Sequence, residues 1–130
     1  MIGRIFDALR YAKHRDEGRR GEDLAHRFLR RNGFTIVARN YRIESGEAEA
    51  DLIAWEGGML AIVEVKSRQS ETYGAPDRAV SEHKRRKLLR VAQEYSRLCG
   101  VAWDRVRLDV VTVILSDPPR VDLFRGSLAK

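Results

Sequence analysis

The sequence is poor in cysteine, in clustered histidine and in long apolar runs, and each absence excludes a class of protein. Cys99 is the only cysteine, so neither a disulfide framework nor a thiolate metal cluster is expected. His14 and His26 have no metal-ligand spacing around them. No apolar stretch is long enough for a transmembrane helix, and the N-terminus lacks the apolar core of a signal peptide. We therefore expect a cytoplasmic protein with no membrane partner.

The composition is that of a folded, basic protein. The 130 residues are 43% hydrophobic and 34% charged, which predicts one domain with a real core. The net charge of +6 favours a polyanionic partner, although a basic proteome would give the same value. We expect a single domain over 1–130, with 1–17 as an N-terminal helical extension and 126–130 as a candidate frayed tail. The oligomeric state stays open, and a homodimer is one candidate.

The stretch from Glu49 to Lys66 predicts two strands joined by a tight turn. Gly57-Gly58 can adopt the positive φ angles of a two-residue hairpin loop, and the flanking residues are rich in β-formers. With these glycines as the turn, Asp51 lies opposite Glu64 and Glu49 lies opposite Lys66. Alternation places all four side chains on one face of the hairpin. The pattern therefore brings two carboxylates together in an otherwise apolar hairpin.

Paired carboxylates in this position indicate a metal site. Directly opposed residues have Cβ atoms about 4.5–5.5 Å apart, where like charges are destabilising. A cation would relieve the repulsion, and Mg²⁺ or Mn²⁺ prefers carboxylate, carbonyl and water oxygens. Lys66, one pleat beyond Glu64, would add an ammonium group, and two acids with a lysine can support phosphodiester hydrolysis. Glu49 has two interpretations: an ordinary ion pair with Lys66, or an acid that sets the charge of Lys66 or contacts a second metal.

The remaining pattern predicts an α/β fold with a mixed sheet of about five strands flanked by helices, in the order α-β-β-β-α-β-β. The other elements are expected over 19–32 (helix), 34–40 (strand), 81–100 (helix), 105–115 (strand) and 121–124 (short edge strand). The helix that Ser81 caps and Gly100 ends should bury a stripe of five side chains, namely Leu88, Val91, Ala92, Tyr95 and Leu98. Asp109, an acid inside an apolar strand, needs a partner, and Arg107 is the nearest candidate.

Basic residues gather at the start of that second helix. Six bases lie within thirteen residues against one acid, Glu82; they are Arg78, Lys84, Arg85, Arg86, Lys87 and Arg90. Such runs are usually solvated faces, but this one is lopsided enough to predict a phosphate-binding rail. Lys84 continues the apolar stripe, so it should either snorkel along the sheet or point toward the acids.

Four further side chains are candidates for the site, and two of them, Arg42 and Glu22, have two interpretations. Arg42 is either a phosphate contact or a solvated loop arginine. Arg68 and Gln69, which follow the hairpin, are candidate substrate contacts. Glu22 lies at the edge of the first helix's apolar face, where it is either a solvated first-turn acid or a further acid near the metal.

Asp51 followed by Glu64-Val65-Lys66 resembles the signature of the PD-(D/E)xK nuclease superfamily. The chain as a whole resembles the YraN-like family of small bacterial proteins, which is related to archaeal Holliday junction resolvases. The resemblance runs through roughly 18–115, with Ala50 where the signature has proline. The residues that carry it are Gly21-Glu22, Asn40-Tyr41-Arg42, Gly46-Glu47, Glu49-Ala50-Asp51-Leu52-Ile53, Val63-Glu64-Val65-Lys66-Ser67-Arg68, Lys84 and Leu108-Asp109-Val110-Val111.

The resemblance implies a restriction-endonuclease-like fold and a Mg²⁺- or Mn²⁺-dependent endonuclease that acts on DNA, with branched or single-strand-containing DNA as the first substrate to test. It implies that Asp51, Glu64 and the Val65 carbonyl bind the metal and that Glu22 completes an outer shell. Lys66 would orient or deprotonate the attacking water, or neutralise the phosphate. Two alternatives remain: a nuclease-derived module that binds nucleic acid without cutting it, and a protein–protein adaptor whose acids are merely paired with neighbouring bases.

Overall fold

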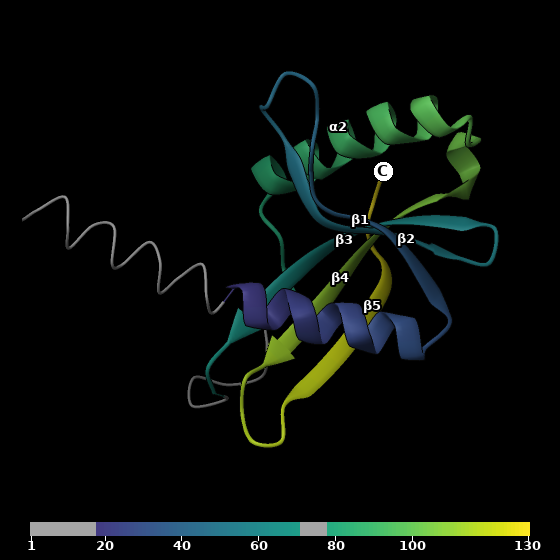
Figure 1. Cartoon of the computed structure of the whole chain (residues 1–130). Helices are drawn as coiled ribbons and strands as arrows, with labels where there is room; N and C mark the ends of the chain where they lie inside the picture. Colours follow the sequence, from purple (N-terminus) through teal and green to yellow (C-terminus); the bar gives the residue numbers. More distant parts are fainter. Residues whose placement is uncertain (1–17, 71–77) are drawn as a thin grey trace, which may run out of the picture.

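The computed structural model describes residues 18–70 and 78–130, and the structural statements below refer to this part of the chain. It forms a five-stranded sheet with a helix on each face (Figure 1). The first helix spans residues 18–31. After it come β1 (Phe34–Arg42), β2 (Glu49–Glu56), β3 (Met59–Arg68), α2 (Glu82–Cys99), the short 3-10 helix η1 (Trp103–Arg105), β4 (Val106–Ile114) and β5 (Arg120–Leu128). The α/β class and the predicted order of elements are confirmed.

The strands lie side by side in chain order, from β1 at one edge to β5 at the other. Neighbouring strands are antiparallel, apart from the parallel pair β3 and β4. These two are parallel because the connection through α2 returns the chain to the end of the sheet at which β3 began. A strand covered on both faces should be apolar throughout, and eight of the nine residues of β4 are buried.

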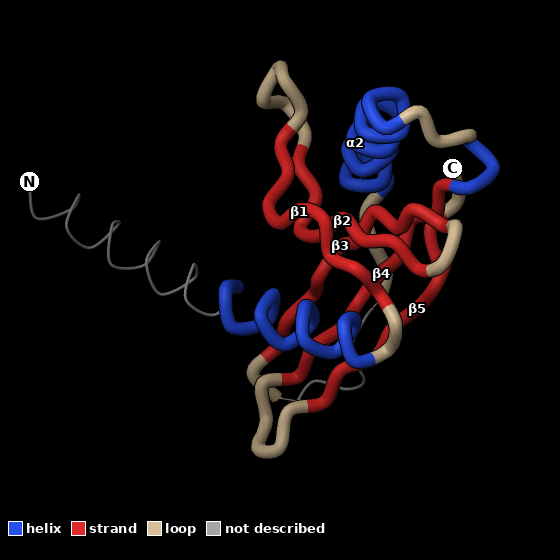
Figure 2. The backbone as a smooth tube through the Cα atoms, turned by 45° about the vertical axis from the view of Figure 1, so that its right-hand side comes forward, coloured by secondary structure: helices blue, strands red, loops and turns tan. Residues whose placement is uncertain are grey.

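Each face of the sheet has its own apolar core, and the two helices lie on opposite faces (Figure 2). On the α2 face, Ile53 and Ile62 pack with Leu88 of the helix. On the other face, Leu52 and Val63 pack with Leu29 of the first helix. Successive residues of β2 and β3 therefore point to opposite cores, as strand alternation requires.

Helix α2 begins and ends where the sequence predicts. The Ser81 side chain accepts a hydrogen bond from the Lys84 N–H, and Gly100 closes the helix in the left-handed conformation, with φ of +67°. The predicted apolar stripe is wrong at one position, because the Leu98 side chain is 70% exposed. Ser96 is buried instead. It lies four residues after Ala92 and eight after Leu88, so helical periodicity puts it on the buried face and turns Leu98 away.

The last strand is longer than expected. β5 continues to Leu128, which pairs with Leu108, so residues 126–128 belong to the sheet and not to a frayed tail. Its course is fixed partly by Asp109, which is fully buried and accepts a 2.8 Å hydrogen bond from the Gly126 N–H. Arg107 donates two further hydrogen bonds to Asp109, which confirms the expected partner. The predicted helical extension over 1–17 lies outside the described residues.

Candidate functional site

The central hairpin has the predicted register, and its two strands separate at the acid pair. Regular pairing runs from Glu56 opposite Met59 to Leu52 opposite Val63 and ends there. Beyond Leu52, β2 stays paired with β1 alone. Asp51 and Glu64 therefore lie where β2 and β3 diverge, a place that we call the fork. In a continuous ladder, as the sequence implied, the two carboxylates would lie directly opposite each other. The divergence of the strands reduces the repulsion between them.

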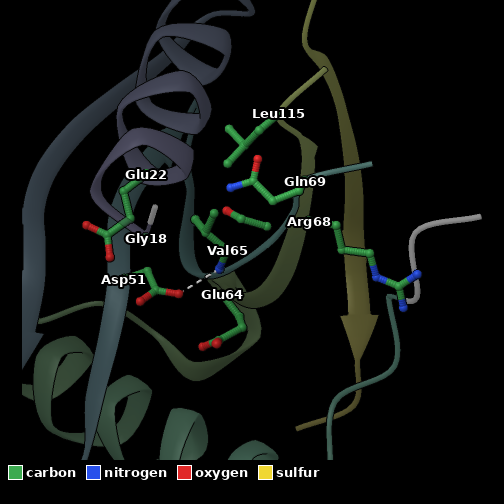
Figure 3. Close-up of a pocket in the computed structure, with 9 residues that line it drawn as sticks. Gly18, Glu22, Asp51, Glu64, Val65, Arg68, Gln69 and Leu115 are labelled. Atoms are coloured by element: carbon green, nitrogen blue, oxygen red, sulfur yellow. Dashed lines mark hydrogen bonds between the residues drawn. The ribbon is translucent and has the colours of Figure 1, made fainter. Parts of the chain in front are cut away.

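Asp51 occupies the gap with its side chain. Its Oδ2 atom accepts a 2.7 Å hydrogen bond from the Val65 N–H, which in a continuous hairpin would bond to a backbone carbonyl (Figure 3). The N–H and C=O groups of a strand residue point toward the same neighbouring strand. The Val65 carbonyl is therefore directed toward the Asp51 side of β3, as the predicted role in metal binding requires.

Glu64, the second acid of the fork, is largely buried and has one oxygen without a hydrogen-bond partner among the described residues. Its side chain is only 14% exposed, and its nearest described cation is Lys84 of α2, whose Nζ lies 3.6 Å from Glu64 Oε2. That distance permits an ion pair but is too long for a hydrogen bond. The same oxygen is buried without a hydrogen-bond partner among the described residues. Buried carboxylate oxygens are normally satisfied, so this atom marks a place where a further donor or a cation would bind favourably.

The electrostatics of the fork favour the neutral forms of both acids. Burial raises the pKa of Asp51 to about 6, and the nearby charge of Glu22 adds to the increase. Burial also raises the pKa of Glu64 to about 7, with the charge of Asp51 as the second cause. The Val65 N–H opposes the shift at Asp51, and Lys84 opposes both shifts. Without a further cation, two carboxylates in this position are energetically unfavourable.

Glu22 reaches the fork from the first helix. It lines a cavity of about 330 Å³ together with Asp51 and Glu64, and Figure 3 shows the three side chains coming from three separate elements. Asn40 donates a 3.1 Å hydrogen bond to Glu22, and the Arg39 guanidinium lies 3.6 Å from it. Of the two interpretations of Glu22, the solvated surface acid is wrong, because its side chain is 17% exposed and faces the cavity.

A close contact between the first helix and β3 brings Glu22 to this position. Gly21 is buried, and a Cβ atom at this residue would lie 1.8 Å from Ser67 Oγ. Only glycine lets the helix approach the end of β3 so closely. Gly21 and Ser67 both belong to the residues that carry the family resemblance, but neither had a predicted role in the site, and Leu115, which lines the cavity with Ser67, was not predicted there. Ser67 could have been found, because it directly follows Lys66.

The predicted arrangement of Lys66 and Glu49 is wrong. Glu49 pairs with Arg42, at 3.1 Å, on the neighbouring strand β1. Lys66 instead donates a hydrogen bond to the Ala79 carbonyl, in the segment before α2. The fork is the physical reason, because Glu49 of β2 stays paired with β1 while Lys66 continues along β3. Lys66 still lowers the pKa of Glu64, so its ammonium acts on the site.

The predicted substrate contacts are dispersed. Arg68 and Gln69 line the cavity with Asp51, but the Arg68 guanidinium points away from the carboxylates (Figure 3). Arg42 is 65% exposed and, with Arg39, lines a second hollow that shares Gly18 and Glu22 with the first.

The bases of α2 do not form one rail. Lys84 alone reaches the acids, which confirms the second of its two expected orientations. Arg85 and Arg86 both pair with Glu82, and Arg85 also donates to the Ala129 carbonyl. On the opposite flank, two bases turn toward the β1–β2 connection: Lys87 donates to the Glu47 carbonyl and Arg90 pairs with the Glu47 carboxylate. Helical periodicity of 3.6 residues separates side chains that are adjacent in the sequence.

The donor set fits a hydrated hard cation better than a metal with many protein ligands. Within residues 18–70 and 78–130, no three side chains of His, Cys, Asp or Glu are grouped as a metal cage. Asp51, Glu64 and the Val65 carbonyl offer oxygen atoms alone. Mg²⁺ typically binds through one or two carboxylates and keeps several waters, and Mn²⁺ accepts similar ligands. The unpartnered Glu64 oxygen is the observation that makes these residues suitable for such an ion.

The same sequence matches a known protein family over most of its length. The model of the "Uncharacterised protein family UPF0102" matches residues 21–113. The chain belongs to this family. The UPF0102 protein of Solibacter usitatus is 47% identical over 131 residues, covering 98% of this chain and 99% of the relative. The UPF0102 protein of Koribacter versatilis is 42% identical over 116 residues, covering 88% and 80%. One from Rhodococcus jostii is 46% identical over 103 residues, covering 79% and 86%.

The expected YraN-like membership is thus confirmed as membership of UPF0102. The matched region begins at Gly21, the close-contact glycine, and includes the whole fork, α2 and β4 up to Val113. Strand β5 lies beyond it. Neither described helix of this UPF0102 protein has the length and apolar character needed to span a membrane.

Proposed function

We propose that this UPF0102 protein is a metal-dependent endonuclease that hydrolyses phosphodiester bonds in DNA. The observation that carries the proposal is the fork, where Asp51 and Glu64 are buried together and one Glu64 oxygen has no hydrogen-bond partner among the described residues. Two acids with raised pKa values and a cationic neighbour are typical of functional sites. The element order is also the one that the resemblance to restriction-endonuclease-like enzymes implies.

In this proposal Asp51, Glu64 and the Val65 carbonyl hold Mg²⁺ or Mn²⁺. A bound ion of this kind polarises a phosphoryl oxygen and lowers the pKa of a coordinated water. The Val65 N–H fixes the Asp51 carboxylate in one orientation, so the site needs little rearrangement on binding. Both acids must be ionised to bind a cation, and their raised pKa values predict that metal affinity increases as the pH rises through about 6 to 7.

Lys66 and Lys84 have separate roles in this proposal, one in the reaction and one in balancing the charge of Glu64. In hydrolysis a water oxygen forms a new bond to phosphorus while one ester P–O bond breaks, which leaves a phosphomonoester and a hydroxyl group. Lys66, two residues beyond Glu64 on the same face of β3, orients that water or stabilises the charge that develops on the phosphate. Lys84 partly balances Glu64 in the metal-free protein. Glu22 lines the cavity beside Asp51 and holds outer-shell water.

The decisive experiment compares cleavage and binding in the same variants. Wild type should cut a branched or flap-containing DNA in Mn²⁺, and Asp51→Asn should abolish the cutting. Lys66→Ala should slow it by about 10²-fold or more, the range usual for the loss of a positioned base or charge stabiliser. Its DNA affinity should stay within a few-fold, because the lysine contributes mostly in the transition state.

The outcomes distinguish the proposal from its two alternatives. A wild-type protein that binds DNA and metal yet leaves plasmid, flap and junction substrates intact would be a nucleic-acid-binding module. If Mn²⁺ changes the melting temperature of neither wild type nor Asp51→Asn, the fork holds no metal. The protein–protein adaptor would then be the remaining interpretation. Branched DNA is chosen by analogy with the resembled resolvases.

A further inference from the structure

The first helix carries a row of arginines on the face that points away from the sheet. Arg20, Arg27 and Arg31 are seven and four residues apart, so they lie along one side of the helix, and Arg30 lies beside them. All four are exposed, whereas Ala25 and Leu29 on the opposite side are completely buried. We call these four residues the arginine stripe.

The stripe differs from the basic residues of α2 in its partners. No ion pair joins a stripe arginine to another residue within 18–70 and 78–130. The two acids of this helix turn toward β1, where Asp23 pairs with Arg39 at 2.8 Å and Glu22 accepts from Asn40.

On α2, by contrast, four bases are already paired with acids of the chain, namely Lys84, Arg85, Arg86 and Arg90. A polyanion would have to displace those acids on α2. On the first helix it would meet guanidinium groups that have no competing acid among the described residues.

The stripe belongs to the helix whose first turns line the fork, but it lies on the opposite side of that helix from the fork-lining residues. Gly18 and Glu22, in the first turns of the same helix, line the cavity that contains Asp51 and Glu64. Arg19 lines the adjoining hollow. Arg27, Arg30 and Arg31 line a third, open hollow of about 300 Å³ farther along the helix. From Arg20 to Arg31 the helix rises about 16 Å, at about 1.5 Å per residue.

We infer that the arginine stripe is the main phosphate-binding surface of this protein and holds a DNA duplex along the outer side of the helix whose inner side lines the fork. One strand of a duplex places a phosphate every 3.4 Å or so along its axis, so the stripe spans about five phosphates. Arginine is suited to phosphate because its planar fork of donors can bind two oxygens at once. The inference rests on the proposed function in taking DNA as the ligand, but it assigns a surface that the active-site residues do not define.

A lipid surface is the other polyanion that could meet this helix, and the side-chain pattern does not favour it. Helices that lie in a membrane interface insert large apolar side chains beneath their basic face. The large hydrophobic residues that are exposed in the described chain are Val37, Leu98 and Trp103, and none belongs to this helix. The apolar side chains of this helix pack in the core between the helix and the sheet.

The test measures binding of a fluorescent 30-base-pair duplex in EDTA, across a range of salt concentrations. Each lost phosphate contact should reduce affinity about fivefold at 0.15 M salt and reduce the log–log salt slope by about 0.9. Arg27→Gln with Arg31→Gln should therefore weaken binding about 30-fold and reduce the slope by about 1.8. The matching lysine double variant should keep most of the slope.

Arg97→Gln with Arg105→Gln is the control. Both residues are exposed, and the two substitutions remove the same total charge as the stripe variant. Arg97, like Arg31, lies in the last turn of its helix. Arg97 is also about 20 Å along α2 from Lys84. This variant should bind within about twofold of wild type, since exposed charges far from the contact act only weakly through screening salt.

Three results would overturn the inference: no duplex binding by wild type, equal losses in the control and stripe variants, or an unchanged stripe variant. Stripe-dependent binding to anionic vesicles with unchanged DNA affinity would overturn it too and assign the surface to membranes. Because binding is measured without metal, failure of cleavage alone would count against the nuclease proposal and leave this inference standing. Thermal melts of each variant would confirm that these exposed substitutions leave the fold intact.

Discussion

Replacing Glu64 with glutamine should stabilise the metal-free protein at alkaline pH. Glutamine keeps the shape of the protonated acid and removes a charge that is buried beside Asp51. A carboxyl group whose pKa is raised by folding contributes stability that is fully present below its unfolded pKa. That stability is lost as the pH rises through the folded pKa. For Glu64 the loss should therefore develop between about pH 4.5 and pH 7 and be complete near pH 8.

The magnitude follows from the shift. A rise from 4.5 to about 7 corresponds to about 3 kcal/mol, at about 1.4 kcal/mol for each pKa unit. Glutamine also removes the partner of Lys84, whose side chain is 35% exposed and can be solvated by water. The attraction of Lys84 already lowers the pKa of Glu64, so the loss of this pair is included in the shift. The expected stabilisation at pH 8 is about 2–3 kcal/mol, or a melting temperature higher by about 7–11 °C for a domain of this size.

Urea unfolding monitored by tryptophan fluorescence, at pH 4.5, 6 and 8 in EDTA, measures the effect. The unfolding curves of wild type and variant should lie close together at pH 4.5, where the glutamate is protonated in the folded state and about half protonated in the unfolded state, and separate as the pH rises. Added Mn²⁺ at pH 8 should stabilise wild type, by about 2.7 kcal/mol at a hundred times the dissociation constant, and leave the variant almost unchanged. The difference in unfolding free energy between variant and wild type should then become smaller or change sign.

The control is Glu47→Gln, because Glu47 is 66% exposed and pairs with Arg90 on the surface. Exposed pairs of this kind contribute about 0–1 kcal/mol, so that variant should follow wild type at each pH. The reasoning would be refuted by a Glu64→Gln protein that is less stable than wild type at pH 8. An advantage of the same size at pH 4.5 would refute it equally, since burial of an ionised carboxylate could not then be its cause.

Two further substitutions test the frame around the fork. Gly21→Ala should cost about 1–3 kcal/mol of unfolding free energy through the clash with Ser67. The control is Gly18→Ala, which should be neutral or slightly stabilising because a Cβ there would meet no atom within 4 Å. Equal effects of the two substitutions would refute the close contact at Gly21. Asp109→Asn should cost about 2–4 kcal/mol in urea unfolding, because a fully buried carboxylate that accepts two hydrogen bonds from Arg107 would be lost, and a cost below about 0.5 kcal/mol would show that the pair is dispensable.

Some features of this protein follow from local chemistry, and the sequence alone determined them. Gly57, with φ of +57°, sets a two-residue turn, and the turn fixes which residues of β2 and β3 pair. The limits of α2 follow in the same way from the Ser81 cap and the left-handed Gly100. Because these interactions join residues a few positions apart, the nearness of Asp51 to Glu64 was predictable from the chain itself.

The tertiary structure decided how those acids are used. Whether a hairpin stays paired to its end depends on the neighbouring strand, and β1 holds Glu49 against Arg42 while β3 turns away. That competition creates the fork and opens the cavity. It lies between residues far apart in the sequence, so no turn or periodicity encodes it.

The same limit applies to charge. The sequence shows that bases are concentrated on α2, but only the packed chain shows that Glu47, Glu64 and Glu82 already pair with them. The arginines of the first helix were less conspicuous because they are spread over several turns. They became a surface when Ala25 and Leu29 buried the other side of the helix against the sheet. Periodicity tells which residues share a face; the fold determines which face remains in water, and which charges there still lack a partner within the described chain.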